Sequence, residues 1–187
     1  VDEIGRLGEM VERLLRLSRL ESGRETMVEE VLQPADLLRT ALGRIEPLAE
    51  RLGHRVEAAG EPMPPVRGDR ERVLEVLSNL LDNALRSSPA GGVVTVRALD
   101  DAAGFVRFEV SDDGPGIRVD ERQRVFERFY TGDQARGSGA GTGLGLSIAR
   151  HIVERLGGAI WVADRAPGAT LCFTLPLAVA PSGEASG

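Results

Sequence analysis

The chain is organised around two stretches, Ser-Asp-Asp-Gly-Pro-Gly-Ile (residues 111–117) and Gly-Ala-Gly-Thr-Gly-Leu-Gly-Leu (residues 139–146). Between them lie an aromatic block, Phe-Glu-Arg-Phe-Tyr (residues 126–130), and a small polar segment. The first stretch follows a predicted strand, and the second leads into a predicted helix. An acidic turn, a mobile linker and a glycine-rich helix start together predict a nucleotide pocket.

The glycine-rich stretch indicates phosphate binding. Five of the nine residues from 137 to 145 are glycine, and an apolar helix pattern begins directly afterwards. The N–H groups and the dipole of a helix N-terminus attract phosphate. The spacing is not Gly-x-Gly-x-x-Gly and no strand–helix–strand unit surrounds it, so it is not the dinucleotide fingerprint. Taken alone, the glycines are also compatible with a flexible linker.

The acidic turn at residues 112–116 indicates recognition of a base. Its glycines allow the backbone to turn tightly and to approach a ligand closely. A carboxylate held there can accept a hydrogen bond from an exocyclic amine such as adenine N6. The alternative is an ordinary β-turn, which Asp-Gly and Pro-Gly both favour.

The predicted helix after Asp69 adds two polar side chains to this set. Asn79 and Asn83 are four residues apart and therefore lie on one helix face, beside an apolar stripe. Amide oxygens suit Mg²⁺, and amide N–H groups donate to phosphate oxygens. Arg86, one turn further on, is expected to reach a phosphate. An Asn pair that caps neighbouring loops is the alternative.

Composition excludes several classes of function. The 187 residues are 42% hydrophobic and 28% charged, which is enough for one globular domain with an appendage. A net charge of -6 argues against nucleic acid or an anionic membrane surface as the main partner. All 23 basic residues are Arg, so neither a Walker P-loop Lys nor a Schiff-base Lys exists. The single cysteine, Cys172, lies in an apolar run and is expected in the core.

Apolar periodicity predicts an α/β fold. The expected helices and strands are helices at 2–22, 34–52, 70–87, 119–129 and 143–156, and strands at 27–32, 55–58, 66–67, 93–99, 105–110, 160–163 and 169–177. Asp69 is expected to cap one helix, and Pro47 to kink another or to end its first part. These elements form a two-layer sandwich of a mixed β-sheet and about three helices, preceded by one helix. The expected domain boundaries are 1–25, 26–178 and a flexible tail at 179–187.

The order of the motifs is more specific than any one of them. Asn-Leu-Leu-Asp-Asn-Ala, Asp-Asp-Gly-Pro-Gly-Ile, Phe-Glu-Arg-Phe-Tyr and Gly-Thr-Gly-Leu-Gly-Leu resemble the N, G1, F and G2 boxes of bacterial sensor histidine kinases. This family shares an ATPase/kinase superfamily with gyrase, the Hsp90 chaperones and MutL. The resemblance covers about residues 1–177 and implies a Bergerat-type ATP-binding fold with ATP and Mg²⁺ as cofactors.

The resemblance also implies roles for individual residues. Asn83 is expected to hold Mg²⁺, and Asn79 and Arg86 are expected to act beside the phosphates. Asp113 is expected to bind the adenine amine, in a turn shaped by two glycines. The remaining implied ATP-binding residues, which include the base of a lid at 131–140, are Gly114, Gly116, Ile117, Phe126, Phe129, Tyr130, Gly141, Thr142, Gly143, Leu144, Gly145, Leu146 and Thr170. Thr131 stands where the family often has Arg, and Arg128 or Arg136 is hypothesised to replace it.

Residues 1–25 resemble the C-terminal part of the second helix of a dimerisation and phosphotransfer domain. Their apolar stripe is expected to pack in a bundle, although a helix folded back on its own domain remains the alternative. Neither His54 nor His151 has a phosphoacceptor box around it. The resemblance thus implies the catalytic part of a two-component kinase, whose γ-phosphoryl group goes to a His of the homodimer's dimerisation domain and then to a response regulator Asp. It implies a cytoplasmic location in a membrane-anchored sensor, without direct membrane contact.

Other members of the superfamily offer three alternatives. The hydrolases place a Glu one turn before the Mg²⁺-binding Asn, as a general base for water. Here that position is Asn79, which favours transfer to a supplied nucleophile. An anti-sigma-type serine kinase shares the pocket but lacks a dimerisation domain, so the helix at 2–22 argues against it. A nucleotide-binding module without activity is the third alternative.

Overall fold

A computed structural model describes residues 26–101, 104–131, 142–164 and 167–178, together with seven helical residues between 5 and 18 (5, 8, 11, 12, 14, 15 and 18). These seven agree with the helix predicted at 2–22. The predicted lid after Thr131, Gly141 and the predicted tail at 179–187 lie outside the described residues.

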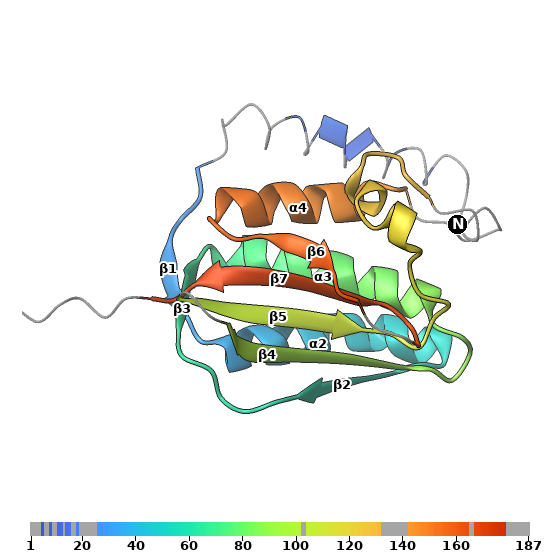
Figure 1. Cartoon of the computed structure of the whole chain (residues 1–187), viewed down its shortest axis with the longest axis horizontal. Coiled ribbons are helices and arrows are strands. Elements are labelled where there is room, and N and C mark those ends of the chain that lie inside the picture. Colours follow the sequence, from blue (N-terminus) through green and yellow to red (C-terminus); the bar gives the residue numbers. More distant parts are fainter. Residues whose placement is uncertain are drawn as a thin grey trace, which may run out of the picture.

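Five strands form the main sheet, in the order β2–β4–β5–β7–β6 (Figure 1). β2 runs parallel to β4 and the other neighbouring pairs are antiparallel, so the predicted mixed sheet is confirmed. A separate antiparallel pair, β1–β3, lies at one end of the main sheet. The strands are β1 (Glu30–Leu32), β2 (Arg55–Ala59), β3 (Val66–Gly68), β4 (Val93–Asp101), β5 (Phe105–Ser111), β6 (Ile160–Val162) and β7 (Thr170–Pro176).

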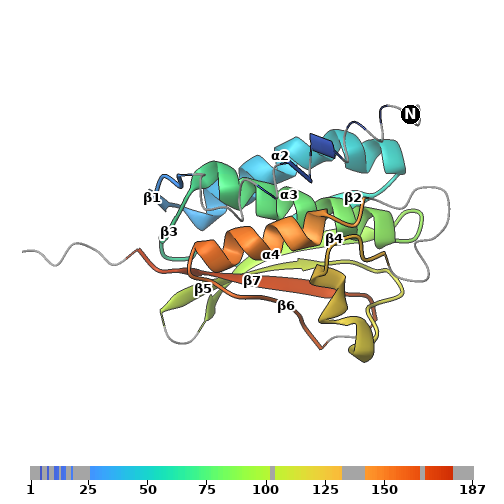
Figure 2. The same cartoon turned by 90° about the horizontal axis from the view of Figure 1, so that it is seen from above.

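Helices cover one face of this sheet, as Figure 2 shows. They are α2 (Pro34–Leu52), α3 (Arg70–Ser87) and α4 (Gly145–Arg155), and α3 contacts both of the others. The Asp69 carboxylate accepts a hydrogen bond from Arg72 N at 3.1 Å, so the predicted N-cap of α3 is confirmed. In the described part of the chain, no helix combines the length and the apolar character needed to cross a membrane.

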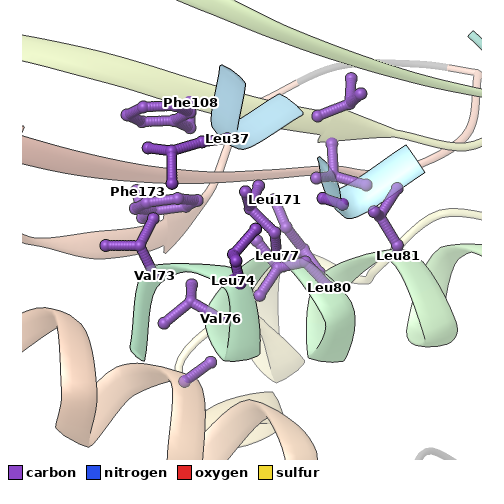
Figure 3. Close-up of a cluster of buried hydrophobic side chains, with 14 of the residues drawn as sticks. Leu37, Val73, Leu74, Val76, Leu77, Leu80, Leu81, Phe108, Leu171 and Phe173 are labelled. Carbon is purple, nitrogen blue, oxygen red and sulfur yellow. The ribbon is translucent and has the colours of Figure 1, made fainter. Parts of the chain in front are cut away.

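The core lies between the sheet and α3 (Figure 3). Inward-facing residues alternate along β4, β5 and β7, and the rings of Phe108 and Phe173 stack with their centroids 4.8 Å apart. Eight apolar residues of α3 are fully buried, because this helix is covered by the sheet and by both neighbouring helices. Each buried Leu contributes about 1.5–3 kcal/mol from removal of its side chain from water.

One of the two alternatives predicted for Pro47 is excluded, and one predicted helix is wrong. Pro47 does not end the first part of a helix, because α2 continues past it to Leu52. Pro47 and Gly43, whose carbonyl loses its partner, are both exposed, so water can satisfy that carbonyl. The helix predicted at 119–129 is replaced by two 3-10 turns, η1 (Val119–Glu121) and η2 (Arg124–Phe126). Only one side chain of these turns, Phe126, is buried, so no apolar stripe supports a longer helix.

The predicted burial of Cys172 is confirmed, but the residue lies on the sheet face opposite the helices. It pairs in register with Glu109 of β5 and Trp161 of β6. The Glu109 carboxylate forms ion pairs with Arg97 at 2.6 Å and Arg107 at 3.0 Å. Burial, and secondarily the Glu109 charge, raises the pKa of the Cys172 thiol to about 12.

Because this thiol is buried and protonated, we expect it to resist alkylation in the folded protein. At pH 8, iodoacetamide should modify Cys172 more than about 100-fold slower than in the urea-unfolded chain. Mass spectrometry against time measures both rates. Equal rates in the two states would contradict the burial described for this sheet face.

Candidate functional site

The C-terminal half of α3 presents the predicted polar face beside the start of α4. Asn79 and Asn83 are half-buried, while Arg86 is exposed. A Cβ atom on Gly145 would lie 3.1 Å from Asn79 Oδ1, so the Asn79 amide lies directly against the first turn of α4. Arg86 Nε donates to the Asp82 carboxylate at 3.0 Å. The structure therefore brings Asn79 and Gly145, 66 positions apart in the chain, together.

The acidic turn after β5 places its two carboxylates differently. Asp113 is exposed, and its carboxylate accepts a hydrogen bond from Val93 N at 3.1 Å. Asp112 is buried, and its Oδ1 accepts from Gly114 N at 2.8 Å and Ala169 N at 3.3 Å. Burial raises the pKa of Asp112 even though these two N–H groups favour the carboxylate.

The buried position of Asp112 was missed in the sequence. The signal was present, because a carboxylate that accepts a hydrogen bond from the N–H two residues on is typical of an Asp-x-Gly turn. Residues 112–114 fit that spacing, whereas Asp113 is followed two residues later by Pro115, which has no N–H.

Glycines allow this turn to pack closely against its neighbours. A Cβ on Gly114 would lie 2.6 Å from the Ser87 carbonyl oxygen at the end of α3. A Cβ on Gly116 would lie 3.0 Å from the Gly168 carbonyl oxygen, and one on Gly168 would overlap the Asp112 carbonyl. The turn is therefore held between α3 and the loop that precedes β7.

Two hydroxyls and an apolar residue complete this side. Thr170 is buried, and its hydroxyl lies 2.9 Å from the Ser111 hydroxyl. Ile117 is half-buried and packs against the core.

The aromatic block meets the start of α4 through its backbone. Phe129 N donates to the Gly143 carbonyl at 2.9 Å, and Phe129 is the one non-glycine residue in the described part of the chain with a positive φ, 60°. Gly143 has φ 67°, and a Cβ there would lie 2.8 Å from Phe129 backbone atoms. Phe126 is buried, whereas the Phe129 side chain is 53% exposed.

The start of α4 fits an anionic ligand. The first-turn N–H groups of a helix have no partner within the helix and carry the positive end of its dipole. Next to this turn, the Thr142 hydroxyl is buried and has no hydrogen-bond partner among the described residues. Leu144 is fully buried and Leu146 packs against the core, which fixes the direction of the helix.

Comparison with known proteins identifies the family of this chain. Residues 68–179 match the family described as histidine kinase-, DNA gyrase B-, and HSP90-like ATPase. The chain belongs to this family. Sensor protein IrlS of Burkholderia pseudomallei is 38% identical over 176 residues, which are 94% of this chain and 37% of IrlS. Sensor-like histidine kinase SenX3 of Mycobacterium tuberculosis is 34% identical, over 94% of this chain and 42% of SenX3.

Solved histidine kinases have the same fold. Full-length ShkA in complex with AMPPNP has a TM-score of 0.82 at 31% identity, over 94% of this chain and 37% of ShkA. The mycobacterial sensor histidine kinase MprB has a TM-score of 0.68 at 34% identity, over 80% of this chain and 98% of the MprB chain. The chain thus contains an ATP-binding domain of the histidine kinase type, and it spans less than half the length of IrlS and SenX3.

In this ATP-binding domain, replacement of Gly143 by Ala should destabilise the junction between Phe129 and α4. We expect Gly143→Ala to lower the free energy of unfolding by roughly 2–4 kcal/mol, from the left-handed backbone and the backbone overlap together. Gly53→Ala is the matched control, because Gly53 also has a positive φ, 72°, but nothing lies within 4 Å of its Cβ position. That control should lose only about 1 kcal/mol. Urea denaturation measures both, and equal losses would contradict the crowding at Gly143.

Proposed function

We propose that this chain is the catalytic part of a two-component sensor histidine kinase. It binds Mg²⁺-ATP and transfers the γ-phosphoryl group to a His in the dimerisation domain of the longer protein, which passes it to an Asp of a response regulator. The observation that carries this proposal is the position of Asn79 against Gly145, because an amide occupies the place that a hydrolase needs for a base.

Asn83 is the proposed Mg²⁺ ligand, and Asn79, Arg86 and the start of α4 are the proposed phosphate contacts. The donor set fits, because amide oxygens suit Mg²⁺, and the Thr142 hydroxyl, which has no partner among the described residues, lies beside the helix N-terminus. When bound, Mg²⁺ neutralises charge on the phosphate oxygens. Gly141, Gly143 and Gly145 are proposed to let the backbone approach the phosphates.

On the base side, we propose Asp112 in place of Asp113 as the acceptor for the adenine amine. Asp112 Oδ1 is already engaged by two backbone N–H groups, which orient the carboxylate and leave Oδ2 as the oxygen for a ligand. The exposed Asp113 instead accepts a hydrogen bond from the start of β4. Gly114, Gly116, Ile117 and Thr170 form the proposed walls of this base site.

The two Asp residues can be separated by matched variants. Asp112→Asn should weaken ATP binding by about tenfold or more, since a hydrogen bond to a charged group is lost. Asp113→Asn should change the affinity by less than about twofold, because its carboxylate only supports the turn. Isothermal titration of each variant with ATP measures this. A larger loss for Asp113→Asn would restore Asp113 as the adenine contact.

The chemistry proposed for this site is direct transfer. A neutral imidazole nitrogen forms a bond to the γ-phosphorus while the bond from phosphorus to the bridging oxygen breaks and ADP leaves. The imidazole proton passes to solvent. Positioning and charge neutralisation supply most of the catalysis in such reactions, and Asn79 and Arg86 are suited to both.

The region before residue 26 is proposed to belong to the dimerisation domain, and the full-length protein is proposed to be a homodimer. Leu14 packs against the core, whereas Val11 and Leu15 are 48% and 56% exposed. Two apolar residues on the outer side of this helix favour a partner helix. Residues 26–178 are the proposed catalytic domain, in the cytoplasmic portion of a membrane-anchored sensor.

The nature of the phosphorylated product tests the function. With Mg²⁺-ATP and a separately supplied His-box domain of a sensor kinase, the chain should produce acid-labile phosphohistidine. Asn83→Ala, or chelation of Mg²⁺, should lower the rate by about 100-fold or more. Arg39→Ala is the control, since among the described residues the ion pair of Arg39 is with Asp36 on the same helix, α2.

Each alternative predicts a different product. Acid-stable phosphoserine would indicate the anti-sigma-type kinase. Release of inorganic phosphate without labelled protein would indicate an ATPase. Nucleotide binding without either product would indicate an inactive binding module.

A further inference from the structure

Glu121 of η1 forms a hydrogen bond with Tyr130, the residue before the predicted lid. The Tyr130 hydroxyl donates to Glu121 Oε1 at 2.7 Å, in a part-buried hydrogen bond. The Glu121 side chain is 17% exposed, and its other carboxylate oxygen lies 3.9 Å from Arg118 Nε. The Arg124 guanidinium stacks 4.9 Å from the centroid of the Tyr130 ring. Two charged residues of the 118–124 segment, Glu121 and Arg124, thus contact the Tyr130 side chain.

Tyr130 is directly connected to the start of α4. Its neighbour Phe129 has a left-handed backbone, which is unfavourable for a bulky residue and persists only where the surroundings hold it. Phe129 N donates to the Gly143 carbonyl, and Gly143 packs on the Phe129 and Tyr130 backbone. Two residues later, Gly145 begins α4 beside Asn79. A shift of Tyr130 would therefore shift the first turn of α4.

We propose that Glu121 is a positioning residue for the phosphates of ATP, acting through Tyr130, Phe129 and Gly143. The inference rests on the function proposed above. A hydrogen bond from a hydroxyl to a part-buried carboxylate is stronger than one to a neutral acceptor. Glu121 therefore limits the motion of Tyr130 more than an amide at this position would.

The base side of the pocket is held by a different set of contacts. Asp112 is fixed by Gly114 N and Ala169 N, and Gly114 packs on the end of α3. None of these contacts involves Glu121 or Tyr130. Loss of the Glu121–Tyr130 hydrogen bond should therefore weaken binding of the triphosphate and leave binding of the nucleoside unchanged.

The test compares two ligands, ATP and adenosine, by isothermal titration in Mg²⁺ with the full 187-residue chain. Glu121→Leu should weaken ATP binding by about tenfold, and adenosine binding by less than about twofold. Tyr130→Phe, which removes only the hydroxyl, should reproduce the ATP loss. Glu121→Gln keeps an acceptor oxygen and should recover most of the ATP affinity, to within about threefold of the wild type.

The matched control is Asp120→Leu. Asp120 is the neighbouring acid on η1, its side chain is 64% exposed, and it pairs with Arg118 within the same segment. It should leave both affinities unchanged. The double variant Glu121→Leu/Tyr130→Phe should lose no more ATP affinity than either single variant, because each substitution removes the same hydrogen bond, the one between Tyr130 and Glu121.

The outcomes distinguish a failure of the role proposed for Glu121 from a failure of the proposed function. Equal losses for ATP and adenosine, an unchanged ATP affinity, or an equal effect of Asp120→Leu would overturn the role of Glu121 while leaving the ATP site in place. If Glu121→Leu does not fold by circular dichroism, Tyr130→Phe alone decides. A wild-type chain that binds neither ligand would overturn the proposed function, and this inference with it.

Discussion

The packing of α3 is the constraint on which the rest of the structure depends. This helix is covered by the sheet and by α2 and α4, so its orientation about its own axis is fixed by eight fully buried apolar side chains. A rotation of one residue would move an Asn into the core, at the cost of a buried amide without a partner. The polar face of α3 therefore has one available direction, toward the start of α4. The positions of Asn79 and Asn83 follow from the hydrophobic core.

The turn after β5 depends on the same sheet. β5 and β7 pair from Phe105–Pro176 to Ser111–Thr170, and this register brings the Asp112 backbone to Ala169. The Asp112 carboxylate is then buried next to a loop that approaches too closely for any side chain at Gly168. A buried carboxylate with a raised pKa costs stability at neutral pH, since the folded state disfavours its ionised form. Such a cost is typical of a functional position.

Much of this fold could be predicted from the sequence, because its elements have clear periodicity. The mixed sheet, the three helices and the cap at Asp69 follow from local patterns. The segment at 119–129 could not be predicted, since its single buried residue gives no period and its form depends on contacts with Tyr130 and α4. At the candidate site, the sequence predicted that Asn79 and Asn83 share one face of α3, and the structure places the Asn79 amide beside the start of α4. The different surroundings of Asp112 and Asp113 follow from the turn geometry and the strand pairing, and of these only the Asp-x-Gly spacing of the turn can be read from the sequence.

In the function proposed above, Asn79 distinguishes the chemistry of this domain from that of the hydrolases in its family. An amide next to the start of α4 can donate to a phosphate and accept from a backbone N–H, but it cannot remove a proton from water at neutral pH. Water is a poor nucleophile without such a base, whereas a neutral imidazole needs none. In the proposed mechanism, this pocket binds ATP and another domain supplies the nucleophile. Under this proposal, specificity for phosphoryl transfer over hydrolysis would come from which group can reach the γ-phosphate, with no additional contact needed within the ATP site.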